Sequence, residues 1–182
     1  MGKNKFEEFL KEEDSEVVEI NWDKKKEFFI DKVKEFYKQM DAFLAPYQDK
    51  IDVKKENYTI NEDYIGSYQV EKRILHIKNN DIIFTPIGTN LIGASGRIDM
   101  EGTNGIVKFV LVPENNNVPK IETAILSTEE DKKKWKEKQD EMAKKNNEAN
   151  KIWKIATPPP NIKYIDLNED TFFDALMEVI NG

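Results

Sequence analysis

The sequence predicts an α+β fold: a mainly antiparallel sheet of about six strands, with helices packed on one face and one charged helix at the periphery. Three patterns predict it. Apolar residues recur at the helical period between residues 29 and 47, alternate with polar residues between 51 and 112, and are sparse in the polar helical stretch 128–150. The 182 residues fit one domain, 1–182, because a chain of this length can bury about 70% of its unfolded surface.

The clearest element is a helix expected over 22–45. Pro46 lacks an amide hydrogen and disfavours helix in the residue before it, so this helix should end near Leu44 or Ala45. A shorter amphipathic helix is expected around Phe6 to Leu10. The long helix presents one apolar face, with residues spaced by three and four, formed by Phe29, Val33, Phe36, Tyr37, Met40, Phe43, Leu44 and Tyr47.

Antiparallel strands are expected between residues 51 and 112, because period-two alternation is broken there by short polar turns. One hairpin should turn at Asn79-Asn80-Asp81, and a second at Gly102-Thr103-Asn104-Gly105. The run 106–112 is almost wholly apolar, so we expect it to be a central strand covered on both faces. The expected strands lie around 51–53 and 58–60 and over 68–78, 82–87, 97–101 and 106–112.

The peripheral charged helix is expected to open at a capping box formed by Ser127 and Glu130 and to run to about Asn150. Its apolar stripe is narrow and can touch only one neighbour, because it consists mainly of Trp135, Met142 and Ala149. This helix should therefore lie at the domain edge and be the most mobile regular element.

The C-terminal region should add strands at 153–156 and 162–167, on either side of three consecutive prolines, and then a final helix. That helix should begin at Asn168 and, together with 22–45, cover one face of the sheet. Gly182 lies where a C-terminal cap is expected. The residues that the final helix should bury are Phe172, Phe173, Leu176, Val179 and Ile180.

Composition favours a cytoplasmic protein. The chain has no cysteine, which excludes disulfides, thiolate zinc sites and cysteine nucleophiles. It shows neither a signal peptide nor an apolar run long enough to span a membrane. Lysine outnumbers arginine by 26 to 2, and Asn and Ile are abundant, a bias typical of an AT-rich, bacterial genome. No cofactor and no metal site are predicted.

Negative charge is concentrated at the two ends of the chain. Residues 1–20 sum to -4 and residues 152–182 to -3, whereas the rest is near neutral. Nucleic-acid affinity comes largely from clustered cations, so no nucleic-acid partner is expected. A protein with a basic surface is the expected partner, and its candidate contacts in the first segment are Glu12, Glu13, Asp14 and Glu16.

The two arginines are candidate anion ligands, since a planar guanidinium can bind a carboxylate or phosphate through two hydrogen bonds. Arg97 alternates with Asp99, so an internal ion pair is the other interpretation of this residue. The glycine-rich corner between Gly88 and Gly96 adds backbone that could approach an anion. The anion-binding residues predicted on this basis are Arg73, Arg97, Gly93 and Gly96.

His76 is the only histidine, and a histidine-based triad or metal site would have to depend on it alone. It alternates along its strand with Ile74, Val70 and Tyr68, so we interpret it as a residue at the border of a packed face.

Three functional hypotheses follow. The first is a non-catalytic interaction protein, such as an immunity protein, an antitoxin or a complex subunit, with acidic termini facing a basic protein partner. The second is a small-anion or nucleotide-binding domain that uses Arg73, Arg97 and the Gly88–Gly96 corner. The third is a hydrolase built only from carboxylates, namely Asp63, Asp81 and Asp99.

Overall fold

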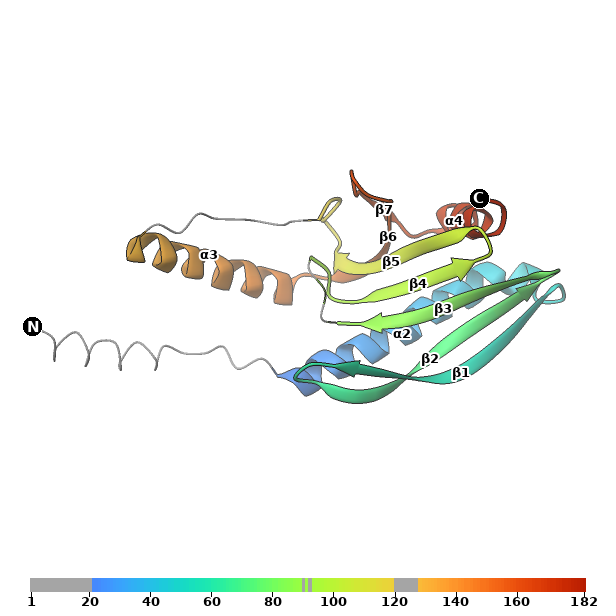
Figure 1. The fold of residues 1–182 in the computed structure, drawn as a ribbon, viewed down its shortest axis with the longest axis horizontal. Coiled ribbons are helices and arrows are strands. Elements are labelled where there is room, and N and C mark those ends of the chain that lie inside the picture. Colours follow the sequence, from blue (N-terminus) through green and yellow to red (C-terminus); the bar gives the residue numbers. More distant parts are fainter. Residues whose placement is uncertain (1–20, 90, 92, 120–127) are drawn as a thin grey trace, which may run out of the picture.

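The computed structural model describes residues 21–89, 91, 93–119 and 128–182. Seven strands form one antiparallel sheet in which every strand pairs with its neighbour in sequence (Figure 1). The predicted α+β class is thus confirmed, with one strand more than the expected six. The strands are β1 (Ile51–Glu62), β2 (Gly66–Ile77), β3 (Asn80–Gly88), β4 (Arg97–Gly102), β5 (Gly105–Pro113), β6 (Lys151–Ala156) and β7 (Tyr164–Asp166).

Two helices, α2 (Trp22–Leu44) and α4 (Glu169–Asn181), cover one face of the sheet, as predicted. Figure 1 shows α2 running behind the strands along most of their length. Its buried Phe36 contacts the rings of Phe84, Phe109 and Trp153, at centroid distances between 4.8 and 6.1 Å. Phe172 of α4 stacks on Phe84 at 6.4 Å, so both helices share one apolar core.

Local signals set the ends of both helices. The Asn21 side chain accepts a hydrogen bond from the amide of Lys24 and caps α2. After Leu44 the chain tightens into a 3-10 turn, Ala45–Tyr47, that contains Pro46. At α4, Asn168 accepts a hydrogen bond from the amide of Thr171, while the Thr171 hydroxyl accepts one from the amide of Asn168.

The two hairpin turns that the sequence predicted are each two residues long. Ile77 pairs with Asn80, so the first turn is Lys78-Asn79, one residue earlier than predicted, and Lys78 adopts a left-handed φ of 55°. The residues around 51–53 and 58–60 belong to one continuous strand, β1. In the second turn Gly102 pairs with Gly105, so Thr103-Asn104 form the apex.

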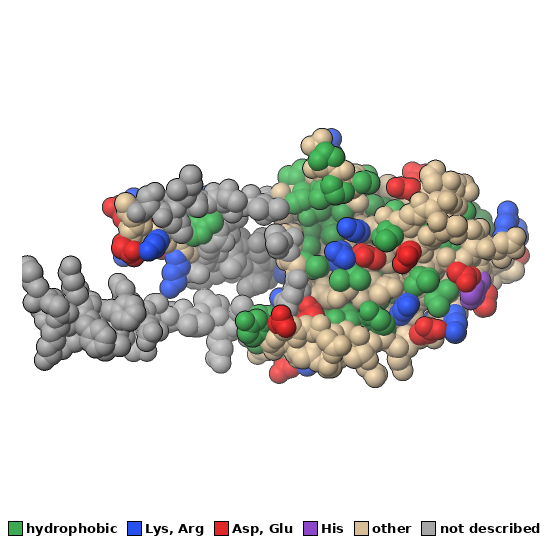
Figure 2. Space-filling view, viewed as in Figure 1, with side chains coloured by type: hydrophobic (Ala, Val, Ile, Leu, Met, Phe, Trp, Pro, Cys, Tyr) green, Lys and Arg blue, Asp and Glu red, His purple; other side chains and the backbone are tan. Residues whose placement is uncertain are grey.

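Strand β5 is central, as predicted. It lies between β4 and β6, and its side chains are buried on both faces of the sheet. Phe109 and Leu111 face the helices. Val110 and Val112 face the other way and pack with Tyr164 of β7 in a small second cluster. Figure 2 shows the face that α2 and α4 leave uncovered, on which charged and apolar side chains are mixed.

The β1–β2 hairpin departs from the rest of the sheet. Strand β2 pairs with β3 only from Arg73 to Ile77, although it pairs with β1 along its whole length. Its buried positions are Tyr68 and Val70, and then Arg73 and Leu75. The inward-facing set therefore changes between residues 70 and 73, because the outer half of the hairpin turns out of the sheet and packs against α2.

Helix α3 (Glu129–Glu148) projects beyond the end of the sheet (Figure 1). Its cap is Thr128: the Thr128 hydroxyl accepts a hydrogen bond from the amide of Asp131, whose carboxylate accepts one from the amide of Thr128. The predicted box of Ser127 and Glu130 is thus wrong by one residue. Ser127 lies outside the described residues, and Glu130 instead forms an ion pair with Lys134. The helix expected around Phe6 to Leu10 also lies outside them.

Across the described ranges, no helix combines the length and the apolar character needed to span a bilayer.

Candidate functional site

The structure places the two arginines on opposite faces of the sheet. Arg73 of β2 faces α2, where it contacts Asp41 and Tyr37. Arg97 of β4 faces the uncovered side, because its neighbour Ile98 points into the core. One ligand cannot bridge the two guanidinium groups through the sheet, so they do not form the single anion site that the second hypothesis requires.

Arg73 is the only arginine on the helix-covered side, and it is 5% exposed. Its Nε donates to Glu71 and its Nη1 to Asp41. The guanidinium carbon lies 4.3 Å from the centre of the Tyr37 ring, a cation–π contact. A flexible lysine could not make all three contacts in one plane, which explains arginine at this position.

Tyr37 supports Arg73 from α2. Its hydroxyl donates to the carbonyl of Phe84 at 3.3 Å, which connects the helix to β3. Burial raises the pKa of Tyr37 far above its usual range, so the hydroxyl remains a donor.

Arg97 forms an internal ion pair with Asp99, which agrees with the second interpretation of this residue. Its Nη2 donates to Oδ2 of Asp99 at 3.1 Å, and its Nε lies 2.8 Å from Oδ1 of the same carboxylate. The second contact is electrostatic only, because the Nε–H is not directed at Oδ1 and both atoms are buried without a hydrogen bond. Arg97 is thereby neutralised by a residue on its own strand.

The glycine corner is filled by a carboxylate of the chain itself. Glu62, at the end of β1, accepts hydrogen bonds from the amide of Thr89 at 2.7 Å and from its hydroxyl at 3.1 Å. Gly88 has a φ of +133°, and a Cβ there would lie 2.7 Å from the Glu62 carboxyl carbon. The corner does bind an anion, but that anion is Glu62.

Tyr68 completes this contact by donating its hydroxyl to Glu62. Burial, and next the hydrogen bond to Glu62, raise the pKa of Tyr68 well above its usual range. Gly96 has a different role: a Cβ there would lie 2.7 Å from the ring of Phe29. Gly93 has a φ of +79°, so its glycine permits a turn. Gly96 is thus explained by close packing and Gly93 by a turn.

The acidic residues predicted to bind a partner divide into two groups. Glu12, Glu13, Asp14 and Glu16 lie outside the described residues. The C-terminal group lies on α4, where four carboxylates are exposed and none forms an ion pair with a described residue. They are Glu169, Asp170, Asp174 and Glu178.

The acidic residues of the other two helices are arranged differently. Several pair with a lysine three or four positions away, at 2.6 to 2.9 Å, in the pairs Asp23–Lys26, Asp31–Lys34, Glu129–Lys132 and Glu130–Lys134. Helix α4 contains no lysine or arginine at all. Its carboxylates therefore remain available to a cation from another molecule.

An apolar stripe runs beside this acidic row. Tyr47 is 45% and Met177 49% exposed, and the Tyr47 ring contacts that of Phe173 at 5.6 Å in a T-shaped arrangement. Phe173 and Met177 are four residues apart and so neighbours along the helix. We call the combination the α4 surface, which consists of Tyr47, Phe173, Met177, Asp170, Asp174 and Glu178.

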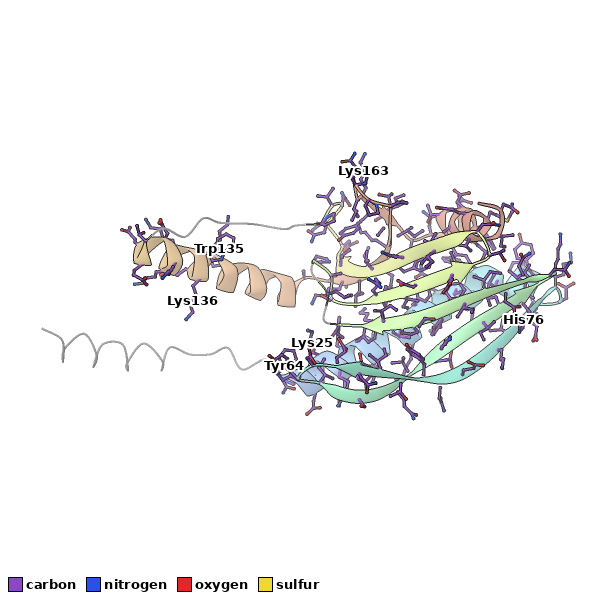
Figure 3. The ribbon with its side chains drawn as sticks, in the orientation of Figure 1. Lys25, Tyr64, His76, Trp135, Lys136 and Lys163 are labelled. Atoms are coloured by element: carbon purple, nitrogen blue, oxygen red, sulfur yellow. The ribbon has the colours of Figure 1, made fainter. Side chains whose placement is uncertain are left out.

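At the opposite end of the molecule, aromatic rings lie beside lysines. Tyr64, 83% exposed, stacks on Trp22 at 5.4 Å, and Lys25 lies over the Trp22 ring. Burial lowers the pKa of Lys151, and the nearby Lys25 ammonium lowers it further. Figure 3 shows Lys25 and Tyr64 at one end of the sheet, whereas α4 lies toward the other. The acids of α4 thus lie toward the end of the sheet that is opposite to Lys25 and Tyr64.

His76 lies near the β2–β3 turn, far from Lys25 and Tyr64 (Figure 3). It pairs across the turn with Asp81, and its side chain is 40% exposed. The predicted face was partly wrong. His76 shares a partly exposed side with Ile74, but Tyr68 and Val70 are buried, because the inward-facing positions of β2 change between Val70 and Arg73.

The three carboxylates of the hydrolase hypothesis do not converge. Asp63 lies in the β1–β2 turn and Asp81 near the other end of that hairpin, beside His76, a separation of roughly 30 Å at the usual rise per strand residue. Asp99 is paired with Arg97. Within the part of the chain that the structure describes, no three acidic or histidine side chains are placed to hold a metal ion.

Sequence reasoning missed the contacts that depend on distant segments. Asp41 and Tyr37 meet Arg73 from α2, and Glu62 reaches Thr89 across 27 residues. Nothing in the local sequence marks those partners. The absence of lysine from residues 169–181, in a chain with 26 lysines, was by contrast a visible signal of unpaired acid.

No protein-family model, curated protein or solved structure matches this chain.

Proposed function

We propose that this protein is a non-catalytic interaction protein, of the immunity-protein, antitoxin or complex-subunit kind, that binds a basic protein partner through the α4 surface. The observation that carries the proposal is a row of carboxylates, Asp170, Asp174 and Glu178, with no ion-pairing partner among the described residues. Several acids in the other two helices are paired with lysines instead. A cation from a partner would supply the missing charge.

The composition of the α4 surface supports a protein partner rather than a solvated helix face. Exposed Tyr47 and Met177 are residue types enriched in protein interfaces. An aromatic and a thioether side chain offer apolar area to be buried, and the adjacent carboxylates set the charge of the complementary surface. Electrostatic attraction of this kind acts mainly on the association rate, so binding should weaken as salt increases.

The acidic N-terminal segment, with Glu12, Glu13, Asp14 and Glu16, is proposed as a second and separable contribution. Its net charge favours the same kind of partner, since the charges of residues 1–20 sum to -4. Trp22, at the start of α2, stacks on Tyr64, which lies toward the opposite end of the sheet from α4 (Figures 1 and 3). The two acidic groups must therefore be tested independently.

The test is a pull-down from the native organism with a salt gradient, followed by carbodiimide cross-linking, which joins carboxylates directly to partner lysines. The wild type is compared with the triple variant Asp170→Lys, Asp174→Lys and Glu178→Lys. The matched control, Glu130→Lys, Glu137→Lys and Glu141→Lys, changes the net charge equally but on α3. A third sample carries Glu12→Lys, Glu13→Lys and Asp14→Lys.

The proposal expects a protein that is lost with the α4 variant, retained with the α3 variant, and cross-linked at an α4 carboxylate. A partner held at high salt and insensitive to the α4 reversal would contradict it. Recovery of nucleic acid as the main ligand would contradict it as well. The N-terminal variant then shows whether that segment adds to binding.

A further inference from the structure

A pocket of about 320 Å³ lies between α2 and the β1–β2 hairpin. It forms where the outer half of the hairpin turns out of the sheet, so that β2 faces the helix without β3 beside it. Protein interiors are otherwise closely packed, and this volume is at the lower end of the range for small-ligand pockets. The site is separate from the α4 surface and independent of the function proposed above.

The pocket lining mixes apolar and polar residues. Ile30 and Val33 of α2 and Val70 of β2 are apolar, whereas Asn57 and Gln69 are amide residues. Arg73 also lines the pocket, and it is almost fully buried. A ligand held here would meet both apolar surface and hydrogen-bonding groups.

Arg73 is held in place with part of its guanidinium unused. Its Nε and Nη1 donate to Glu71 and Asp41, and its ring contact with Tyr37 fixes the plane. Its Nη2 forms no hydrogen bond with a described residue. This atom is therefore not fully buried, since a fully buried nitrogen without a hydrogen bond occurs only at Nε of Arg97 among the described side chains. Because Arg73 lines the pocket, this nitrogen has two N–H donors that a ligand there could engage.

One cation of the pocket is left for a ligand. The lining includes Arg73, Lys34 and Lys38, and Arg73 is already paired with two carboxylates, Glu71 and Asp41. Lys34 is paired with Asp31 at 2.9 Å. Lys38, also on α2, forms no ion pair with any described residue, so its ammonium can turn toward a ligand.

We propose that this pocket binds a small organic anion that has an oxyanion head, carboxylate or phosphate, and an apolar body. The head accepts hydrogen bonds from Nη2 of Arg73 and pairs with Lys38. The body lies against Ile30, Val33 and Val70. Neither Arg97 nor the glycine corner takes part.

The binding test is an NMR titration with three probes that share one chain: hexanoate, hexyl phosphate and neutral hexanol. The side-chain amide signals of Asn57 and Gln69 report on the pocket. We expect saturable shifts with at least one of the two anions and at least tenfold weaker binding of hexanol. Whichever anion binds more tightly identifies the preferred head group. Equal affinity for hexanol, or no saturation with any probe, would overturn the proposal.

Four variants test which residues carry the binding. Ile30→Trp fills the pocket and should abolish the shifts while leaving Arg73 and its partners intact. Lys38→Gln should weaken anion binding up to about fivefold, the range of an exposed ion pair. The matched control, Lys24→Gln, removes an exposed lysine of the same helix that does not line the pocket, and it should change nothing.

Arg73→Lys separates ligand binding from the structural role of the guanidinium. It keeps the charge but loses the fixed donors, so affinity for the anion should fall about tenfold. A thermal melt shows whether this variant is folded. If it is not, Ile30→Trp and Lys38→Gln still decide the outcome, and shifts that persist in Ile30→Trp would overturn the proposal.

Discussion

Helices α3 and α4 both begin at a capping box, yet only α4 is held by the sheet. Helix α4 buries Phe172, Leu176 and Val179 against the core, and its carboxylates form no ion pair within the described ranges. Helix α3 projects from the sheet, and its first-turn acids pair with its own lysines. Tertiary packing stabilises α4, whereas α3 depends on local interactions, and those are individually weak.

This contrast shows which kind of helix can carry acidic side chains without ion pairs. A helix without tertiary support needs its ion pairs, each contributing about 0.2–0.5 kcal/mol. A helix fixed by buried aromatic rings can leave its exposed face for another purpose. The α4 surface can therefore carry acidic side chains that form no ion pair with the described residues.

The largest effect is expected where the apolar core beneath the helices is interrupted. Leu111→Asp places an unpaired carboxylate at a fully buried site in β5, which costs several kcal/mol and so approaches the whole stability of a domain. We expect loss of the cooperative melt by circular dichroism. Lys133→Asp adds a carboxylate on the exposed side of α3 and should leave the melting temperature nearly unchanged. An unchanged midpoint for Leu111→Asp would mean that β5 is an exposed edge strand.

The next effect concerns local opening. Backbone amides of α2 and α4 should exchange hydrogen near the rate set by global unfolding, because opening them exposes the core. Amides of α3 should be among the fastest of the described helices, with opening free energies lower by several kcal/mol. Native-state hydrogen exchange measures both. Protection of α3 equal to that of α2 would reveal a partner surface along it, such as an oligomer interface.

A pair of aromatic truncations sharpens the same comparison. Phe172→Ala removes a ring that is fully buried and should cost about 3–5 kcal/mol in urea denaturation. Trp135→Ala, in α3, should cost less than about 1 kcal/mol, since its side chain is only partly buried. A large loss for Trp135→Ala would show that this tryptophan packs against a surface that stabilises the fold.

The smallest effect is expected at the caps. Asn168→Ala should lower global stability by about 1 kcal/mol, because α4 unfolds together with the core. Thr128→Ala removes the corresponding cap of α3 but should affect only the helicity of that segment. The urea midpoint reports the change in global stability, and the far-ultraviolet circular dichroism signal reports the change in helicity. Equal changes in global stability would mean that α3 folds cooperatively with the sheet.

Much of the fold could be predicted because its signals are local. Apolar spacing around Phe29 to Leu44 predicted α2, Pro46 predicted its end, and Asn168 predicted the start of α4. The wholly apolar run 106–112 predicted a central strand. Where the prediction slipped by a residue, at Thr128 and at Lys78, a competing local choice of cap or turn was equally compatible with the sequence.

The candidate sites were less predictable, since they depend on residues far apart in the chain. The choice of Arg73 as a residue of interest came from its rarity, but its pocket exists only because the β1–β2 hairpin leaves β3. The corner from Gly88 to Gly96, with Gly93 and Gly96 as candidate ligands, suggested an anion site, but Glu62, 26 residues before Gly88, already occupies it at Gly88 and Thr89.

The sequence by itself determined the element types, most of their ends and the distribution of charge, because these follow from periodicity, capping and residue counts. The tertiary structure decided which face each strand presents, because a period of two leaves the inward side undetermined wherever a strand twists out of its sheet. It placed Arg73 against α2 and Arg97 on the uncovered face. It also set the acids of α4 beside Tyr47, since only packing brings a turn at residue 47 against a helix that begins at residue 169.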